Sequence, residues 1–296
     1  MTAQHAKQLV KNALYRTIGE TSATFGLTAN GDHTLRVLMY HKVNDIPDNP
    51  TTVPIGRFDE QLAQIGDLGY QPVDLDAVLD YYTLGKPLPP KAVLITFDDG
   101  YRDILENALP VLEQRGHPAV IFVPVAYMED SIPLPHEVKL TERGTRNPTL
   151  DWGLMRELDA GGVRVESHGI SHRPLAETTL DEAVREIAVS KLKLEAELGR
   201  PVRAYAYVKG SEADFRPVHE SILKQAGYEI AFTSTSRGNG PSTNPFRLGR
   251  YNVEPYPART FELVLAGACD LIAVKDTVAG THARRLFNQA LGTSTR

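Results

Sequence analysis

The stretch Leu94–Ile95–Thr96–Phe97–Asp98–Asp99–Gly100 joins a run of apolar residues directly to two adjacent carboxylates and a glycine. A short apolar run that is bounded by turn residues predicts a buried strand, here over 93–97. Because side chains alternate along a strand, Asp98 and Asp99 are expected to point in different directions. One carboxylate can then bind a metal ion while the other acts as a base. The alternative is a turn in which an aspartate caps the helix that follows.

Strand and helix signals alternate along the rest of the chain, with no internal repeat and no linker. Further strands are expected at 35–40, 119–125, 163–167, 204–208, 230–234 and 246–253. Helices are expected at 58–68, 75–82, 104–112, 151–158, 180–198, 215–226 and 261–272, with a kink or break at Pro110. This order predicts an α/β fold with a mostly parallel sheet wrapped by helices, most naturally a barrel of seven or eight strands.

The two ends of the chain read differently from this central part. Residues 1–34 are expected to form a poorly anchored N-terminal extension, partly helical, with Leu9, Val10, Ala13 and Leu14 on a modest apolar side. Residues 257–296 are expected to form a C-terminal helical segment that is packed on the barrel or partly mobile.

In the central part of the chain, residues 127–148 are polar and long for a connection, which favours a part in a substrate groove.

Composition excludes several classes of protein. The chain has 296 residues, 42% of them hydrophobic and 23% charged, and a net charge of −5, which argues against nucleic acid as a partner. No apolar run approaches the roughly 18–20 residues of a membrane span. Residues 1–27 lack the apolar core of a signal peptide, so a cytoplasmic location is expected. The one cysteine, Cys269, excludes an internal disulfide, and nothing in the sequence indicates the oligomeric state.

Polar residues cluster where the expected strands end. His41, Asp98, Asp99, His168 and Lys209 all fall at such ends. In α/β barrels the carboxyl ends of the strands carry the chemistry, so these side chains are expected to meet at one rim.

A second motif, Ser167–His168–Gly169–Ile170–Ser171–His172, places two imidazoles four residues apart. If the strand passes into a helical turn here, both rings lie on one side and can hold one ion. Two histidines and one aspartate leave an open position for water and substrate. Zn²⁺ suits this set, with Co²⁺ or Ni²⁺ as alternatives. A solvated histidine pair is the alternative when the motif is taken alone.

Together these motifs resemble the polysaccharide deacetylases, a family of sugar N-deacetylases, over residues 35–253. The segment Thr96–Phe97–Asp98–Asp99–Gly100 matches the first family motif in full. The second motif matches in its two histidines, with Gly169 where Ser or Thr is usual. The segments 39–41 and 152–158 are also similar. The resemblance implies a distorted (β/α) barrel with about seven parallel strands and a deacetylase catalytic domain over 35–256.

The resemblance also implies roles for the site residues. Asp99, His168 and His172 are expected to hold the metal, and Asp98 is expected to be the general base. Arg250 lies where some members place an arginine that holds the base carboxylate; the alternative is a surface arginine.

Two other family motifs depart from the usual pattern. The third motif reads Tyr205–Ala206–Tyr207–Val208–Lys209–Gly210, with Val208 in place of proline. The backbone N–H expected to stabilise the oxyanion then belongs to Lys209, whose ammonium would add positive charge or simply be solvated. The late Leu-x-His motif that supplies the general acid is missing, because 271–276 contains no histidine. His41 is the substitute that we consider, as acid or as substrate contact.

The sequence therefore predicts a metal-dependent hydrolase that removes acetyl from an N-acetylated amino sugar in a polysaccharide, oligosaccharide or glycoconjugate precursor. An inactive metal-binding protein that recognises glycans is the first alternative, because the third and last motifs are altered. A deformylase or a cyclic-amide hydrolase using the same site is the second.

Overall fold

The computed structural model describes residues 3–26, 34–128 and 132–282. Its centre is a parallel sheet with strand order β10-β1-β5-β6-β7-β8-β9, to which β4 adds at the start of β5. The strands of this sheet are β1 (Arg36–Tyr40), β4 (Gln71–Pro72), β5 (Ala92–Asp98), β6 (Ala119–Val123), β7 (Val163–Ser167), β8 (Ala204–Ala206), β9 (Ile230–Phe232) and β10 (Tyr251–Asn252). A separate parallel pair is formed by β2 (Lys42–Val43) and β3 (Thr52–Val53). The predicted α/β fold, a distorted barrel with about seven parallel strands, is confirmed, and the strands form a curled half-barrel.

The sheet curls so that its two ends approach each other. Leu248, just before β10, forms a parallel bridge with Phe232 at the end of β9. Its N–H donates to Ala231 O at 2.9 Å, and its carbonyl accepts from Thr233 N at 2.7 Å. The segment 248–250 therefore connects β9 with β10, the strands at the two edges of the sheet. The carboxyl ends of the strands converge on one rim.

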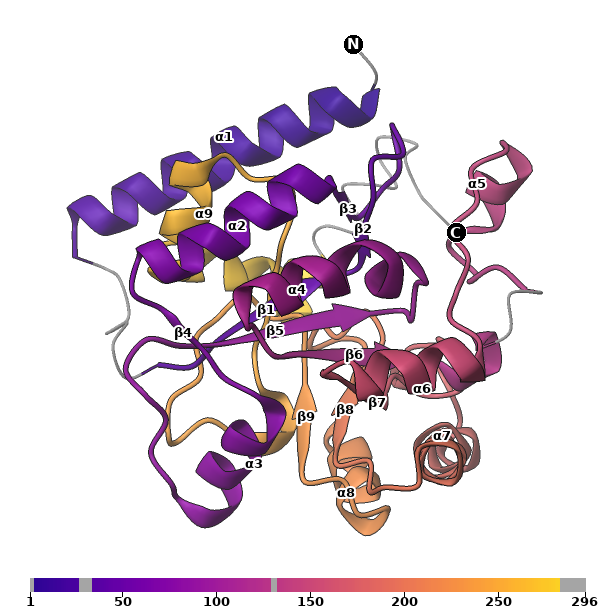
Figure 1. The fold of residues 1–296 in the computed structure, drawn as a ribbon. Coiled ribbons are helices and arrows are strands. Elements are labelled where there is room, and N and C mark those ends of the chain that lie inside the picture. The colour runs from indigo at the N-terminus through magenta and orange to yellow at the C-terminus, as the bar shows by residue number, and fades with distance from the viewer. Residues whose placement is uncertain (1–2, 27–33, 129–131, 283–296) are drawn as a thin grey trace.

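Helices surround the sheet, except that α1 packs on α9 and α5 projects from the body of the protein (Figure 1). They are α1 (Ala3–Thr24), α2 (Ile55–Asp67), α3 (Leu75–Leu84), α4 (Leu109–Arg115), α5 (Val138–Glu142), α6 (Trp152–Ala160), α7 (Leu180–Leu198), α8 (Pro217–Gln225) and α9 (Ala258–Leu265). All seven residues of β5 are buried, as expected for a parallel strand covered on both faces. No helix in the described part of the chain is both long and apolar enough to cross a bilayer.

Two expected elements differ from those observed. The strand expected at 246–253 is only β10, because Pro245 begins a 3-10 turn, η5 (Pro245–Arg247), whose first N–H is capped by the Asn244 side chain. The helix expected at 261–272 ends at Leu265, and the chain continues as a 3-10 segment, η6 (Asp270–Asp276). The expected break near Pro110 is confirmed: a π-helical turn, η2 (Ile104–Ala108), precedes α4, and Pro110 lies in the first turn of α4.

The N-terminal helix is longer and better anchored than its sequence suggested. Leu9, Val10 and Leu14, which were expected on the buried side, are 49%, 70% and 54% exposed. The anchor is Tyr15 instead, which is buried, stacks on the ring of Tyr256 at 5.4 Å and receives a 2.9 Å hydrogen bond from Lys275. The helix therefore belongs to the packed body of the protein, beside α9 (Figure 1).

At Gly19, α1 packs closely against α9. A Cβ atom at this position would lie 2.9 Å from Leu263 Cδ1 and 3.0 Å from Leu263 Cβ. We expect Gly19→Val to lower the free energy of unfolding by about 1–3 kcal/mol, because overpacking forces neighbouring groups to move. Urea denaturation followed by circular dichroism measures this.

Gly66, in α2, is the matched control, because a Cβ atom added there would have no packed neighbour within 4 Å. Gly66→Val should be neutral or slightly stabilising, since valine has a better helix propensity than glycine. Equal losses in the two variants would contradict the close packing of α1 on α9.

Candidate active site

The predicted site residues lie at the carboxyl ends of the strands. Asp98 is the last residue of β5, and Asp99 follows it directly. His168 follows β7, and His41 follows β1. The curl of the sheet brings these ends together, so residues distant in sequence meet at one rim.

Asp99, His168 and His172 form a cluster of possible metal ligands. Asp99 Oδ1 lies 2.9 Å from His172 Nε2 and 3.6 Å from His168 Nε2. One donor atom from each residue falls within 4.8 Å of the other two, and within the described residues this is the one such group of three or more histidine, cysteine or acidic side chains. Two imidazole nitrogens and one carboxylate oxygen are a common ligand set for a catalytic zinc ion, so the donor set fits a metal.

The backbone at the end of β5 gives Asp99 its direction. Asp99 has φ 76° and Gly100 has φ 72°, so two consecutive residues are left-handed. A side chain at Gly100 would also lie 3.0 Å from Met128 Cε and 3.2 Å from Val123 Cγ1. Glycine is therefore required at position 100 by both conformation and space. The turn separates the Asp99 carboxylate from that of Asp98, as the strand alternation predicted.

A second contact fixes the orientation of His168. Its Nδ1 lies 2.8 Å from Ala206 O at the end of β8. A carbonyl can only accept, so Nδ1 carries the hydrogen and Nε2 keeps its lone pair toward Asp99. Burial lowers the pKa of His168 to about 4, which keeps the ring neutral. A neutral imidazole with a free Nε2 is the form that binds a metal ion.

Asp99 and His172 form an ion pair in the same cluster. Burial disfavours both charged forms, but each group stabilises the charge of the other. The pKa of Asp99 is consequently well below its usual value, and the pKa of His172 is raised. A metal ion bound here would replace the proton on His172.

Asp98 contacts Arg250 through two parallel hydrogen bonds. The Nη1 and Nη2 atoms of Arg250 donate to Asp98 Oδ1 and Oδ2, each at 2.7 Å. Arg250 is fully buried and also donates to Thr233 O at 3.0 Å and to Thr96 Oγ1 at 3.3 Å. Burial alone would raise the pKa of Asp98, but the guanidinium outweighs it and lowers that pKa. The alternative of a surface arginine is wrong, and the carboxylate of Asp98 is kept ionised.

His41 and Lys209 lie around this centre with less defined contacts. His41 is close enough for its charge to lower the pKa of both Asp98 and Asp99, and its Nδ1 is buried without a hydrogen-bond partner. Lys209 has φ 59°; its side chain is 58% exposed, and its ammonium pairs with Glu177 at 3.3 Å. The ammonium of Lys209 is therefore mainly solvated.

One histidine at the site was missed by the sequence analysis. His136 Nε2 lies 3.5 Å from Asp99 Oδ2 and 2.8 Å from the Tyr101 hydroxyl. Its loop is tied down by the buried ion pair between Lys42 and Glu137, at 2.7 Å. The length of the 127–148 connection was the only signal for it in the sequence, because the loop has no periodic pattern.

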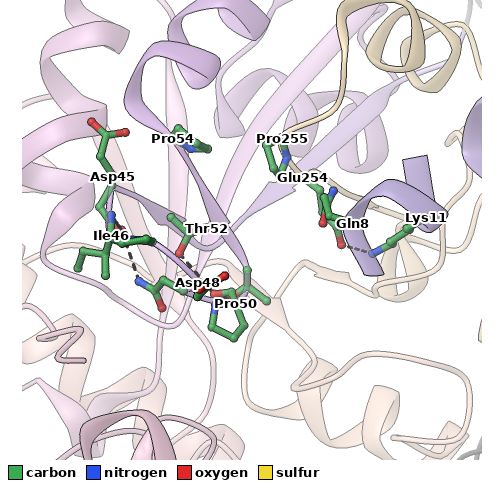
Figure 2. Close-up of a pocket in the computed structure, with 14 residues that line it drawn as sticks. Gln8, Lys11, Asp45, Ile46, Asp48, Pro50, Thr52, Pro54, Glu254 and Pro255 are labelled. Atoms are coloured by element: carbon green, nitrogen blue, oxygen red, sulfur yellow. Dashed lines mark hydrogen bonds and ion pairs between the residues drawn. The ribbon is translucent and has the colours of Figure 1, made fainter. Parts of the chain in front are cut away.

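A cavity of about 550 Å³ lies between the loop after β2 and the start of α1 (Figure 2). It is lined by the loop 44–54, by Glu254 and Pro255 after β10, and by Gln8 and Lys11 of α1. Its wall shares Asn49 with the buried network at the site, since Asn49 Oδ1 accepts from Lys42 Nζ at 2.8 Å. The cavity therefore borders the network that holds the His136 loop.

Several known proteins are similar to this chain in sequence. A family model described as polysaccharide deacetylase matches residues 85–231. The "Putative polysaccharide deacetylase YxkH" of Bacillus subtilis (strain 168) is 30% identical over 224 residues, which are 75% of this chain and 72% of that protein. The poly-beta-1,6-N-acetyl-D-glucosamine N-deacetylase of Escherichia coli (strain K12) is 38% identical over 100 residues, 33% of this chain but 15% of that protein.

Solved structures show the same fold. IcaB from Ammonifex degensii superposes with a TM-score of 0.65 at 27% identity, covering 81% of this chain and 98% of that one. The Streptococcus pyogenes deacetylase PplD, solved in complex with acetate, superposes with a TM-score of 0.66 at 22% identity, covering 79% and 99%.

The Arg250–Asp98 pair gives a stability prediction that depends on pH. Arg250→Met leaves a buried carboxylate without a partner, and we expect the free energy of unfolding at pH 7 to fall by about 3–5 kcal/mol. The lowered pKa of Asp98 in the native protein means that the pair stabilises above the unfolded-state pKa and loses this effect as the pH falls. In the variant, burial raises that pKa, so the contribution of Asp98 to stability should instead decrease as the pH rises from about 4 to 7.

Chemical denaturation at several pH values measures both effects. Arg156→Met is the control, because Arg156 is half exposed and pairs with Glu197 on the surface, where such pairs contribute about 0–1 kcal/mol. A loss in Arg250→Met that is no larger than in this control would contradict the role of the buried pair.

Proposed function

The chain belongs to the polysaccharide deacetylase family, and on that premise we propose that it is a metal-dependent hydrolase that removes the acetyl group from an N-acetylated amino sugar. The observation that carries the proposal is that the adjacent carboxylates of Asp98 and Asp99 lie in different chemical environments. Asp98 is held by Arg250, and Asp99 lies among two histidines with a free or exchangeable nitrogen. A base beside a metal-binding cluster is what amide hydrolysis by water requires.

We propose Asp99, His168 and His172 as the metal ligands and Zn²⁺ as the natural metal, with Co²⁺ or Ni²⁺ able to take its place. When bound, the metal supplies a Lewis acid that polarises the acetamide carbonyl and increases the acidity of water. The contact of His168 Nδ1 with Ala206 O supports this assignment, because such contacts orient metal-binding imidazoles.

Asp98 is the general base in this proposal. Its lowered pKa keeps it ionised at neutral pH, and the two bonds from Arg250 hold both carboxylate oxygens in a fixed plane. It accepts a proton from the attacking water. Arg250 orients the base and prevents it from being neutralised by burial, so Arg250 is a positioning residue.

Amide hydrolysis also needs a general acid and a group that stabilises the oxyanion. We assign the general acid to His41, whose ring lies near both aspartates and has a buried, unpartnered Nδ1, and it returns a proton to the leaving amine. The backbone N–H of Lys209 is assigned to the oxyanion that forms on the acetyl carbon. Lys209 has a left-handed backbone, which is unusual for a residue other than glycine. Such backbone conformations are found more often at functional sites than elsewhere.

The relatives and the cavity beside loop 44–54 support a proposal for the substrate class. The Escherichia coli relative is named for poly-beta-1,6-N-acetyl-D-glucosamine. We propose that a glycan chain runs across the open rim and that the cavity beside loop 44–54 accepts a neighbouring sugar unit (Figure 2). Its lining of amides, carboxylates and proline rings offers both hydrogen bonds and apolar contact to a sugar ring.

Asp98→Asn tests the mechanism. The amide cannot accept the proton of water, so we expect acetate release from N-acetylglucosamine oligomers to fall by about 10²–10⁴-fold. Metal content should remain that of the wild type, because Asp98 is not among the proposed ligands. Acetate release and metal content are measured on the same preparation.

Glu106→Gln, an exposed change in the same segment, should retain activity and metal. Full activity in Asp98→Asn would refute the proposed base. Wild-type protein that binds metal and glycan but releases no acid would favour the inactive glycan-binding alternative. Formate in place of acetate would favour a deformylase, and loss of a cyclic amide without release of either acid would favour the ring-opening alternative.

A further inference from the structure

The short turn between His168 and His172 is held by one carboxylate from a distant helix. Glu186, in the second turn of α7, is largely buried and points at this turn. Its Oε2 accepts from the backbone N–H of Ile170 at 2.7 Å and of Ser171 at 3.0 Å, while its Oε1 accepts from the Ser171 hydroxyl at 2.5 Å. Both oxygens of Glu186 are thus used by residues that lie between the two histidines.

The opposite side of the turn is held by the segment after β6. The carbonyls of Gly169 and Ile170 accept from the N–H groups of Val125 and Ala126, both at 3.1 Å. The Tyr127 hydroxyl donates to Ser171 O at 3.3 Å. The turn therefore has its N–H groups on Glu186 and its carbonyls on the 125–127 segment, and it has little freedom to move.

The turn needs this support because its backbone is unusual. Gly169 has φ +81°, and His172 has φ 54°, which is unfavourable for a residue with a side chain. Such conformations cost about 1–3 kcal/mol and persist only where surrounding contacts impose them. A Cβ atom at Gly169 would lie 3.1 Å from both Glu186 Oε2 and the Tyr205 hydroxyl, so the glycine and the carboxylate fit each other.

We propose that Glu186 is a positioning residue of the metal centre: it fixes the turn that carries His168 and His172, so that both imidazoles face Asp99 before a metal arrives. This inference rests on the proposed function for the identity of the ligands. Preorganisation of this kind increases metal affinity because the ligands lose less freedom on binding. Loss of a contact that holds a metal ligand in place typically lowers metal affinity by about 10–100-fold.

Glu195 provides a matched comparison on the same helix. Its carboxylate also binds a backbone group, accepting from Val202 N at 3.0 Å, and it pairs with Lys191 at 2.9 Å. Val202 lies in the connection to β8, away from the histidine turn. Loss of Glu195 should therefore cost stability in a similar way without affecting the metal site.

The test uses Glu186→Ala, Glu186→Gln and Glu195→Ala in the full chain. Zn²⁺ affinity is measured by competition with a chromogenic chelator, and the absorbance spectrum of the Co²⁺-loaded protein reports ligand geometry. We expect Glu186→Ala to bind Zn²⁺ about 10–100-fold more weakly, with a changed Co²⁺ spectrum. Glu186→Gln should stay close to the wild type, because its amide oxygen can accept both N–H groups and its NH₂ can donate to the Ser171 hydroxyl. Glu195→Ala should keep wild-type affinity.

Wild-type affinity in Glu186→Ala, or an equal loss of affinity in Glu195→Ala, would overturn the proposal. A loss in Glu186→Gln as large as in Glu186→Ala would also overturn it, since charge and not positioning would then be responsible. If Glu186→Ala does not fold, Ser171→Ala removes one of the three bonds, and a few-fold weaker affinity is expected; unchanged affinity would refute the proposal. These measurements need no substrate, so failure of the deacetylase assignment is detected separately, by the acetate assay.

Discussion

The paired hydrogen bonds between Arg250 and Asp98 are the interaction on which the rest of the site depends. A buried carboxylate and a buried guanidinium are each costly alone, and they are tolerated here because both oxygens and several N–H groups find partners. Arg250 comes from the segment just before β10, Thr233 from the end of β9, and Asp98 from the end of β5. Through its bond to Thr233, Arg250 therefore joins the two edges of the curled sheet at the same point where it keeps the proposed base ionised.

The other aspartate is controlled by the backbone. Two consecutive left-handed residues after β5 separate the direction of Asp99 from that of Asp98. One carboxylate then lies against a guanidinium and the other against imidazoles, and each environment keeps its acid ionised for a different purpose. The adjacency of the two acids in the sequence therefore gives two separate chemical environments, because the strand ends in a tight turn between them.

The sequence predicted the parts of the site that are encoded locally. The strand that ends in Asp98 and Asp99, the histidine pair and the parallel architecture all followed from short patterns. Arg250 was identified by its place in a weak motif, and the structure adds that it is buried against Asp98. His136 and Glu186 were missed, because their importance arises from contacts with residues more than ten positions away and no motif marks either residue. Helix α1 was misjudged because its most apolar residues face outward while Tyr15 forms the anchor. The last strand was overextended into the 3-10 turn that begins at Pro245.

The most direct test of this account is the release of acetate by protein that has been stripped of metal and then reloaded. Acetate and free amine are measured together from N-acetylglucosamine oligomers, before chelation, after chelation and after addition of one equivalent of Zn²⁺. The account predicts that chelation abolishes turnover, that one equivalent restores it, and that acetate and amine appear in equal amounts. Undiminished turnover in protein shown to contain no metal would contradict it.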